Sequence, residues 1–176
     1  RMVLRSLELR DAPLMLEWMH DERVSGVFRF PAMEYTLNKV EEVIKNSKIV
    51  NELDKPSDIH YAITEDGGEY LGTISLKNID YVNRNAEYAI VLRYSAQRKG
   101  IPLEATKELL EMFFERLELH RLYLNVLSDS FSAVELYKKI GFIYEGQWKE
   151  HLFLNGKWRT LSWYAMTRDV WESNKI

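Results

Sequence analysis

Residues 86–117 read AEYAIVLRYSAQRKGIPLEATKELLEMFFERL, and this stretch decides which class of fold the chain adopts. Residues 86–92 are a short apolar run of the kind that forms a central β-strand. From Pro102 onward the apolar residues follow a helical period, and glutamates and lysines occupy the opposite face. The stretch therefore predicts a strand, a loop and an amphipathic helix. The apolar face of that helix is expected to consist of Leu103, Thr106, Leu110, Phe113 and Leu117.

The residues after this helix predict one strand, a second helix and two further strands. Residues 121–127 alternate as a strand does. Residues 132–135 fit a capping box that starts a helix, and Gly141 is a favourable residue just past its end. Asn155-Gly156 then joins two long strand patterns, and this dipeptide is the strongest short signal for a hairpin.

The residues before the quoted stretch predict two helices between strands. Asp11 is expected to cap a helix that carries Pro13 in its first turn and ends near His20. Thr36 is expected to cap the second helix. The predicted strands of this region are residues 3–9, 60–64 and 70–76, with a hairpin turn at residues 65–68.

The predicted element order is β-α-α-β-β-β-α-β-α-β-β. Strands joined by short turns are antiparallel neighbours, whereas the helix that begins at Pro102 makes one parallel crossover. The sequence therefore predicts an α/β fold with a mixed, mostly antiparallel central sheet flanked by helices. No repeat, low-complexity tract or linker interrupts the pattern, so we expect a single domain over residues 1–176.

The composition is that of an ordinary globular protein, with 46% hydrophobic and 29% charged residues. The net charge of −3 argues against nucleic acid or an anionic membrane as a partner. The chain has no cysteine, which excludes disulfides, thiolate metal sites and cysteine nucleophiles and favours a reducing cytoplasm. Its apolar runs fall far short of the ~20 residues that cross a bilayer. No signal peptide is expected, and Arg1 ahead of Met2 looks like a vector remnant.

Motifs for several common chemistries do not occur. The four histidines are far apart in the sequence and form neither a helical HxxxH pair nor an HExxH motif, so no metal site is expected. A GxSxG elbow, a Walker loop and a GxGxxG fingerprint are also lacking. Hydrolase, phosphoryl-transfer and Rossmann interpretations therefore have no motif to support them.

Residues 97–102, QRKGIP, lie between the predicted central strand and the start of the predicted amphipathic helix. Such a loop presents backbone N–H groups and the positive end of a helix dipole, and both suit a phosphate. Arg98 and Lys99 add positive charge for phosphate oxygens. The alternative is an ordinary turn with a glycine at positive φ. This segment alone favours the alternative, because helix N-termini are common and anion sites are few.

Two further side chains are candidates for chemistry. Tyr137 lies on the predicted short helix before Gly141, and Glu87 lies inside the predicted central strand. Each has a simpler explanation, because buried tyrosines are common in cores and a strand glutamate can face solvent. Taken singly, the simpler explanation is favoured for both residues.

Four segments in one order carry a resemblance over nearly the whole chain. They are Gln97-x-x-Gly100-x-Pro102 followed by Glu104-Ala105, LHRL at residues 119–122, LYKKIGF at residues 136–142, and the last hairpin with residues 144–146, 154–157 and 164–166. Together they resemble the GNAT superfamily of N-acetyltransferases. The resemblance is strongest to the branch that acetylates the N-termini of ribosomal proteins, together with the related amino-sugar acetyltransferases. In that family a Q/R-x-x-G-x-G/A loop holds the pyrophosphate of acetyl-CoA, and two of its three positions match here.

Two residues depart from the family pattern. Pro102 replaces the last Gly/Ala of the loop, which removes one N–H from the phosphate site but suits the first turn of a helix. Ser130 stands where the family usually has an asparagine that contacts the cofactor. These departures motivate an alternative interpretation, a non-catalytic module of this fold that binds CoA. A third interpretation is an interaction protein that dimerises through its last hairpin and needs neither the cofactor nor Tyr137.

The resemblance implies transfer of an acetyl group from acetyl-CoA to a primary amine, by direct attack in a ternary complex. Glu87 would take the amine proton, or else serve as an acceptor-site or structural carboxylate. Tyr137 would protonate the departing CoA thiolate, and backbone N–H groups near residues 90–92 would hold the oxyanion. The implied cofactor-binding residues are Ile90, Val91, Leu92, Gln97, Arg98, Lys99, Gly100, Ile101, Pro102 and Ser130.

The resemblance also implies where the acceptor amine binds. The side chains expected around it are Phe28, Arg29 and Phe30, with the second helix, and Trp148, His151 and Trp163 of the last hairpin. The two tryptophans suit stacking on a sugar, although at hairpin spacing they are more often core or dimer contacts. The acceptor stays open among a protein N-terminus, an amino sugar, a polyamine and an aminoglycoside.

Overall fold

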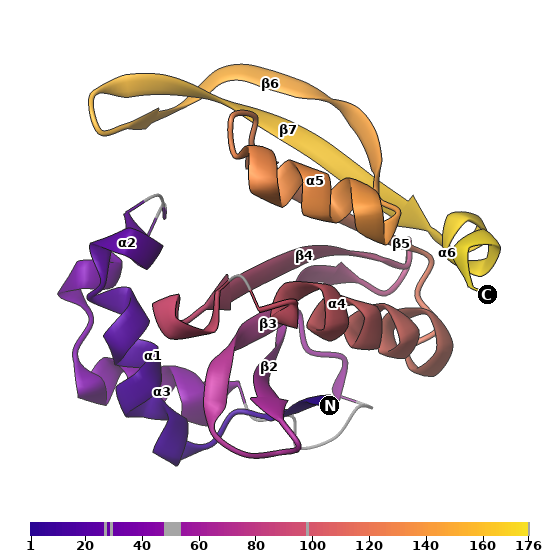
Figure 1. Ribbon diagram of the computed structural model, residues 1–176. Helices are drawn as coiled ribbons and strands as arrows, with labels where there is room; N and C mark the ends of the chain where they lie inside the picture. Colours follow the sequence, from indigo (N-terminus) through magenta and orange to yellow (C-terminus); the bar gives the residue numbers. More distant parts are fainter. Residues whose placement is uncertain (27, 29, 48–53, 98, 176) are drawn as a thin grey trace. The chain divides into compact units, whose positions relative to one another are not determined.

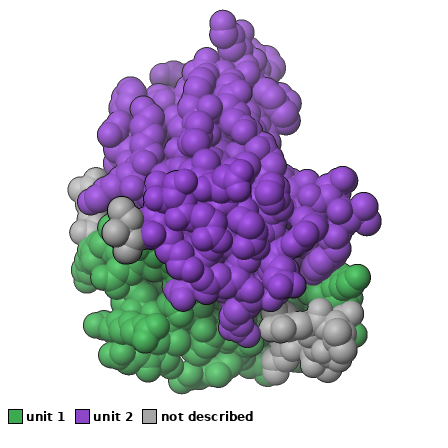
Figure 2. Space-filling model, turned by 90° about the vertical axis from the view of Figure 1, so that its right-hand side faces the viewer, with its two compact units in different colours: residues 1–77, 89–109 green, residues 78–88, 110–176 purple. Residues whose placement is uncertain are grey.

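The computed structural model describes residues 1–26, 28, 30–47, 54–97 and 99–175. They form two compact units, which Figure 2 shows in different colours. The first unit contains Arg1–Lys77 and Ala89–Leu109, and the second contains Asn78–Tyr88 and Leu110–Ile176. Each unit is thus built from two separate segments of the chain. The single domain expected over residues 1–176 stays a prediction.

Seven strands of the described residues form a sheet, in the order β1-β2-β3-β4-β5-β7-β6. They are β1 (Met2–Ser6), β2 (Ile59–Glu65), β3 (Tyr70–Asp80), β4 (Asn85–Leu92), β5 (Arg121–Leu127), β6 (Ile143–Leu154) and β7 (Lys157–Thr167). β1 with β2, β2 with β3, β5 with β7 and β6 with β7 are antiparallel pairs. β4 and β5 pair in parallel, with Glu87 opposite Tyr123. The predicted mixed sheet and its parallel crossover are therefore confirmed.

Six α-helices accompany the strands in the described part of the chain (Figure 1). They are α1 (Ala12–Met19), α2 (Glu22–Ser25), α3 (Leu37–Asn46), α4 (Ile101–Glu111), α5 (Phe131–Ile140) and α6 (Arg168–Asn174). Shorter turns are η1 (Leu9–Asp11), η2 (Ala32–Glu34) and η4 (Tyr94–Ala96), and the π-helical η5 (Met112–Arg116) continues from α4. The sequence did not predict α2 or α6. Among the described residues, none of the helices has the length and apolar character needed to span a membrane.

The core of the first unit includes side chains from α1, α3, β2 and β3. α1 packs beside α3 (Figure 1), and Val40 and Ile44 of α3 are fully buried in this core. The hydroxyl of Thr36 accepts a hydrogen bond from the N–H of Lys39 at 3.2 Å. The predicted cap of this helix is therefore confirmed, because the bond satisfies one of the N–H groups left free at a helix start.

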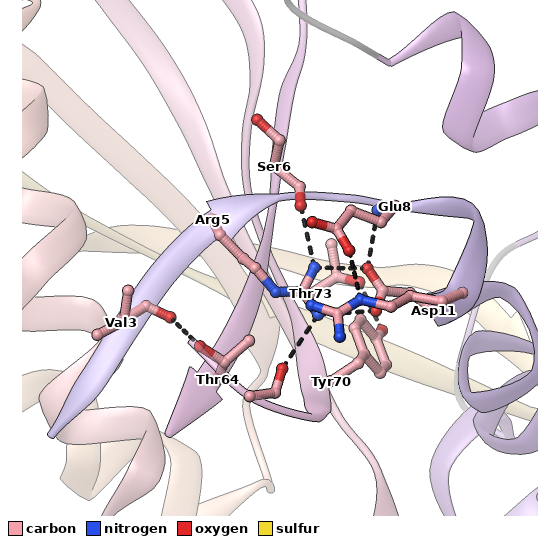
Figure 3. Close-up of polar contacts among 10 residues, drawn as sticks. Val3, Arg5, Ser6, Glu8, Asp11, Thr64, Tyr70 and Thr73 are labelled. Carbon is pink, nitrogen blue, oxygen red and sulfur yellow. Dashed lines mark hydrogen bonds and ion pairs between the residues drawn. The ribbon is translucent and has the colours of Figure 1, made fainter. Parts of the chain in front are cut away.

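Asp11 stands at the start of α1 but does not cap it, which corrects the sequence prediction. Its two carboxylate oxygens each accept a hydrogen bond from the guanidinium of Arg5 at 2.8 Å (Figure 3). One of them also accepts the backbone N–H of Glu8 at 2.8 Å. This turn ends β1 at Ser6, three residues before the predicted end. The carboxylate therefore joins β1 to η1 and leaves the first N–H groups of α1 to other partners.

The helix α5 of the second unit begins earlier than predicted. Its N-cap residue is Ser130, whose side chain makes no capping bond, and the capping box expected at residues 132–135 is therefore wrong. Its end is confirmed, because Gly141 has a φ of 118°, in the region that favours glycine. The predicted hairpin is also confirmed, with φ values of 50° at Asn155 and 78° at Gly156 between β6 and β7.

Candidate active site

Glu87 lies in the first half of β4, which belongs to the second unit. Its chain neighbours Ala86 and Tyr88 are buried, and the side chain of Glu87 lies on the opposite, half-buried face of the strand. Its carboxylate accepts hydrogen bonds from the amide of Asn78 at 3.2 Å and from the amide of Asn125 at 3.3 Å. The prediction that Glu87 lies in a central strand is confirmed, and its role stays a prediction.

Tyr137 lies on α5 in the second unit and is 8% exposed. Its ring is 5.7 Å from that of Tyr88 and 6.0 Å from that of Phe142, both in edge-to-face geometry. Burial raises the pKa of Tyr137 to about 12, against a smaller lowering by a hydrogen bond with Tyr88. The hydroxyl therefore keeps its proton at neutral pH, which is what a proton donor needs.

The second half of β4 belongs to the first unit and contains the residues expected to hold an oxyanion. Ile90 and Val91 are half-buried, and Leu92 is buried. β3 approaches this part of β4 very closely at Gly72, where an added Cβ would lie 2.3 Å from the carbonyl oxygen of Val91. Glycine at position 72 is therefore needed for this contact. The role of the N–H groups of residues 90–92 stays a prediction.

The loop before α4 contains the residues predicted to hold a phosphate, and that role stays a prediction. Gly100 has a φ of 73°, and a Cβ added there would meet nothing within 4 Å, so the backbone is open to a ligand. Lys99 and Gly100 are exposed, whereas Gln97 is half-buried and its amide points to the carbonyl of Leu92 at 3.5 Å. Arg98 lies outside the described residues.

The two residues that depart from the family pattern both lie at helix starts. α4 begins at Ile101, so Pro102 is its second residue, where a missing N–H costs no helical hydrogen bond. Ser130 is half-buried at the start of α5, and its backbone N–H is bonded to the carbonyl of Leu127 at 3.0 Å. Neither residue distorts the helix that it precedes or enters.

The side chains predicted around the acceptor form one aromatic cluster in each unit. In the first unit Phe28 and Phe30 stack with centroids 5.5 Å apart, next to Trp18 and Tyr35. Arg29 lies outside the described residues. In the second unit the ring of Trp148 is 4.4 Å from that of Trp163 and 4.8 Å from that of His151.

The sequence interpretation missed the two amides that hold Glu87. Asn78 lies in β3, two residues beyond the predicted strand 70–76, and Asn125 lies in β5, inside the predicted strand 121–127. A usable signal was present at Asn125, because asparagine is depleted in strands. Asn78 is exposed and has a φ of 51°, in the left-handed region that asparagine tolerates.

The mixed sheet flanked by helices defines an α/β protein, with a left-handed glycine at position 100 ahead of α4 and a buried tyrosine at position 137. The family described as Acetyltransferase (GNAT) domain matches residues 1–143. The chain belongs to this family, and the predicted superfamily is therefore confirmed.

Individual relatives agree with this assignment. Spermidine N(1)-acetyltransferase of Escherichia coli K12 is 35% identical over 97 residues, which cover 55% of this chain and 52% of that protein. The [Ribosomal protein uS5]-alanine N-acetyltransferase of the same organism is 27% identical over 129 residues, covering 70% and 65%. The chain thus spans about half the length of the curated spermidine relatives that it matches.

A solved structure shows the same fold. The spermidine N-acetyltransferase of Vibrio cholerae, solved in complex with CoA and spermine, superposes with a TM-score of 0.85 at 23% sequence identity. The match covers 97% of this chain and 98% of that one.

Proposed function

We propose that the protein transfers an acetyl group from acetyl-CoA to a primary amine. The observation that carries this proposal is the buried hydroxyl of Tyr137, whose pKa is raised to about 12, in a member of an acetyltransferase family. Acetyl-CoA, when bound, supplies a thioester: the amine nitrogen bonds to its carbonyl carbon, the C–S bond breaks, and the sulfur gains a proton.

The residues of the chain fit this cosubstrate. The exposed Lys99 supplies a cation for phosphate, and the open backbone at Gly100 leads into the free N–H groups of the first turn of α4. The half-buried Ile90 and Val91 supply strand N–H groups for a developing oxyanion.

The remaining residues move protons in this proposal. The carboxylate of Glu87 holds the acceptor as an ammonium or takes its proton, because only the neutral amine has a lone pair for attack. Tyr137 holds a proton on Oη and donates it to the departing sulfur. An α-amine has a pKa near ~8 and a lysine-like amine near ~10.4, so an α-amine needs less help from a base.

The acceptor belongs to the class of primary amines. A polyamine is supported by the relatives named for spermidine, and a protein N-terminus by the relative named for ribosomal protein uS5. The cysteine-free composition supports a reducing cytoplasm as the location, which we propose together with the function.

Calorimetric titration with acetyl-CoA tests the proposal first. We expect binding in the micromolar range, ~−8 kcal/mol, followed by acetyl transfer to at least one member of a panel of primary amines. Absence of binding up to millimolar acetyl-CoA would contradict the proposal and favour a module of this fold without turnover.

Gly100→Ala is expected to weaken acetyl-CoA binding about tenfold, or ~1.4 kcal/mol, because a left-handed alanine strains the loop. The strain alone should lower the free energy of unfolding by ~1 kcal/mol. Gly67→Ala is the matched control, since Gly67 has a φ of 81°, equally open space and a place in the β2–β3 turn. Calorimetry and urea unfolding should show equal destabilisation of both variants and weakened binding only for Gly100→Ala.

We also propose a homodimer formed through the hairpin of β6 and β7. Phe153 and Trp158 are 60% and 62% exposed, and their rings are 4.8 Å apart. β6 is the last strand of the sheet order, and an edge with exposed aromatic side chains suits contact between copies. Trp158→Ser is expected to convert a dimer to a monomer in sedimentation velocity. A monomeric wild-type protein would refute this proposal.

A further inference from the structure

The carboxylate of Glu87 is held from both of its neighbouring strands. Nδ2 of Asn78, on β3, donates to Oε1 at 3.2 Å, and Nδ2 of Asn125, on β5, donates to Oε2 at 3.3 Å. β4 lies between these two strands in the sheet. Each oxygen therefore accepts one amide hydrogen from a different strand, and the plane of the carboxylate is fixed by two bonds.

The register of the parallel pair places the side chains of Glu87 and Asn125 on one face of the sheet. Glu87 is opposite Tyr123 in the parallel pair of β4 and β5, and Asn125 is two residues beyond Tyr123. Residues two apart in a strand share a face, so Asn125 and Tyr123 both point to the side of Glu87. Strand propensity does not explain an asparagine here, because asparagine is depleted in sheets.

The use of amides has a consequence for charge. A carboxamide donates hydrogen bonds without adding positive charge, so the carboxylate of Glu87 keeps its negative charge. Glu145 of the same unit shows the contrast, because the guanidinium of Arg121 bonds to it at 2.8 Å and lowers the pKa of Glu145. A substrate cation would meet a neutralised pair at Glu145 and a net negative charge at Glu87.

The amides also leave part of the carboxylate free. An ionised carboxylate offers about four lone-pair positions, and the two asparagines occupy two of them. The remaining positions suit the N–H groups of a primary ammonium, which carries three donors and no acceptor. The bonds to the asparagines, at 3.2 and 3.3 Å, lie at and just beyond the long end of the usual N–H···O range.

The surroundings of Glu87 favour a cation. Burial raises the pKa of Tyr123, the negative charges of Glu87 and Asp80 raise it further, and the positive charge of Arg121, which is itself paired with Glu145, lowers it. Trp163 is the cross-strand partner of Asn125, and its ring lies 6.2 Å from that of Tyr123. Aromatic rings beside an anion are a favourable environment for an alkyl ammonium.

We propose that Asn78 and Asn125 are positioning residues that orient the carboxylate of Glu87 to bind the primary ammonium group of the acceptor. This inference rests on the proposed acetyl transfer and names the chemical class recognised at that site, a primary alkyl ammonium. The asparagines act through Glu87, and their removal lets the carboxylate turn away from the direction in which the ammonium binds.

The kinetic test is Asn125→Leu, which replaces the amide by an apolar group of similar size. The KM for 1-aminobutane is expected to rise about 10- to 100-fold, the range for loss of a hydrogen bond to a charged group. The KM for acetyl-CoA should not change. Asn125→Gln keeps a carboxamide and should recover part of the loss. Asn85→Leu is the matched control, because Asn85 is a half-buried asparagine of β4 in the same unit.

A spectroscopic test does not depend on turnover. The carbon NMR signal of the Glu87 carboxylate, assigned by its loss in Glu87→Gln, should shift in the free Asn78→Leu and Asn125→Leu proteins. It should also shift when 1-aminobutane, but not the uncharged 1-butanol, is added to the wild type. A signal that neither asparagine substitution moves overturns the positioning role. A signal unmoved by 1-aminobutane overturns the ammonium assignment.

The two tests separate this inference from the proposed function. If 1-aminobutane shifts the Glu87 signal and the asparagine variants weaken that binding, the inference stands even where no acetyl group is transferred, and only the transferase proposal fails. If the wild type acetylates 1-aminobutane with the same KM as both asparagine variants, the transferase proposal stands and this inference fails.

Discussion

Tyr137→Phe is expected to lower kcat toward the lower end of the ~10²–10⁴-fold range for loss of a general acid, with little change in the affinity for acetyl-CoA. The substitution removes only the hydroxyl and leaves the ring between Tyr88 and Phe142. The lower end of the range applies because a pKa of about 12 makes Tyr137 a weak acid relative to an ordinary thiol near ~8.5. Steady-state kinetics and acetyl-CoA calorimetry on the same preparation measure the two effects.

The pH dependence of kcat tests whether Tyr137 keeps its proton over the working range of pH. A raised pKa keeps the tyrosine protonated until the pH approaches about 12, so the donor is present throughout the neutral and mildly alkaline range. Deprotonation of Tyr137 should therefore cause no fall of the wild-type kcat in this pH range. Any alkaline fall that is seen should also occur in Tyr137→Phe. Tyr164→Phe is the control, since Tyr164 is a 4% exposed tyrosine of β7 in the same unit. An unchanged kcat in Tyr137→Phe would remove Tyr137 from the chemistry.

Local sequence signals predicted helix caps correctly where the capping side chain bonds within its own helix. Thr36 caps α3 as its position before an amphipathic pattern predicts, and its hydroxyl accepts the N–H of Lys39 within the same helix. Asp11 carries the same signal and fails, because Arg5 comes from β1 and takes both of its oxygens. The difference is a contact between separate elements, which a window of neighbouring residues does not contain.

The sequence did not predict α2 and α6, and each has a physical reason. α2 has four residues, too few for a helical period to show. α6 follows β7 without a break, and its Trp171 is buried by stacking on Phe114 at 5.1 Å, a contact across the chain. Tertiary packing of Trp171 therefore stabilises α6 more than its own sequence does.

Part of the candidate site could be placed from the sequence, and part required the structure. The placement of Glu87 in a strand and Tyr137 on a helix followed from period and composition. The two amides at Glu87 come from positions 9 and 38 residues away in the chain. The contact between Glu87 and Asn125 depends on the parallel register of β4 and β5, which places Glu87 opposite Tyr123. Sequence alone fixes no register between strands separated by a helix, so this part of the site required the structure.

Arg5→Leu is expected to lower the free energy of unfolding by ~3–5 kcal/mol, because it leaves a buried carboxylate without its cation. Asp11 is 2% exposed, and the side chain of Arg5 is 15% exposed. The paired hydrogen bonds between them hold β1 to the turn before α1 (Figure 3). After the substitution, Asp11 retains the N–H of Glu8 but no positive charge. Urea unfolding followed by circular dichroism measures the loss.

A double substitution separates the unpaired charge from lost packing. Replacing both partners of a buried ion pair by apolar residues is often nearly neutral, so Arg5→Leu with Asp11→Leu should recover much of the stability lost in Arg5→Leu. Arg10→Leu is the surface control, since Arg10 and Glu8 are 59% and 48% exposed, and such pairs contribute less than ~1 kcal/mol. If the double variant is as unstable as Arg5→Leu, the loss comes from packing of the arginine stem, and the uncompensated charge of Asp11 is not its cause.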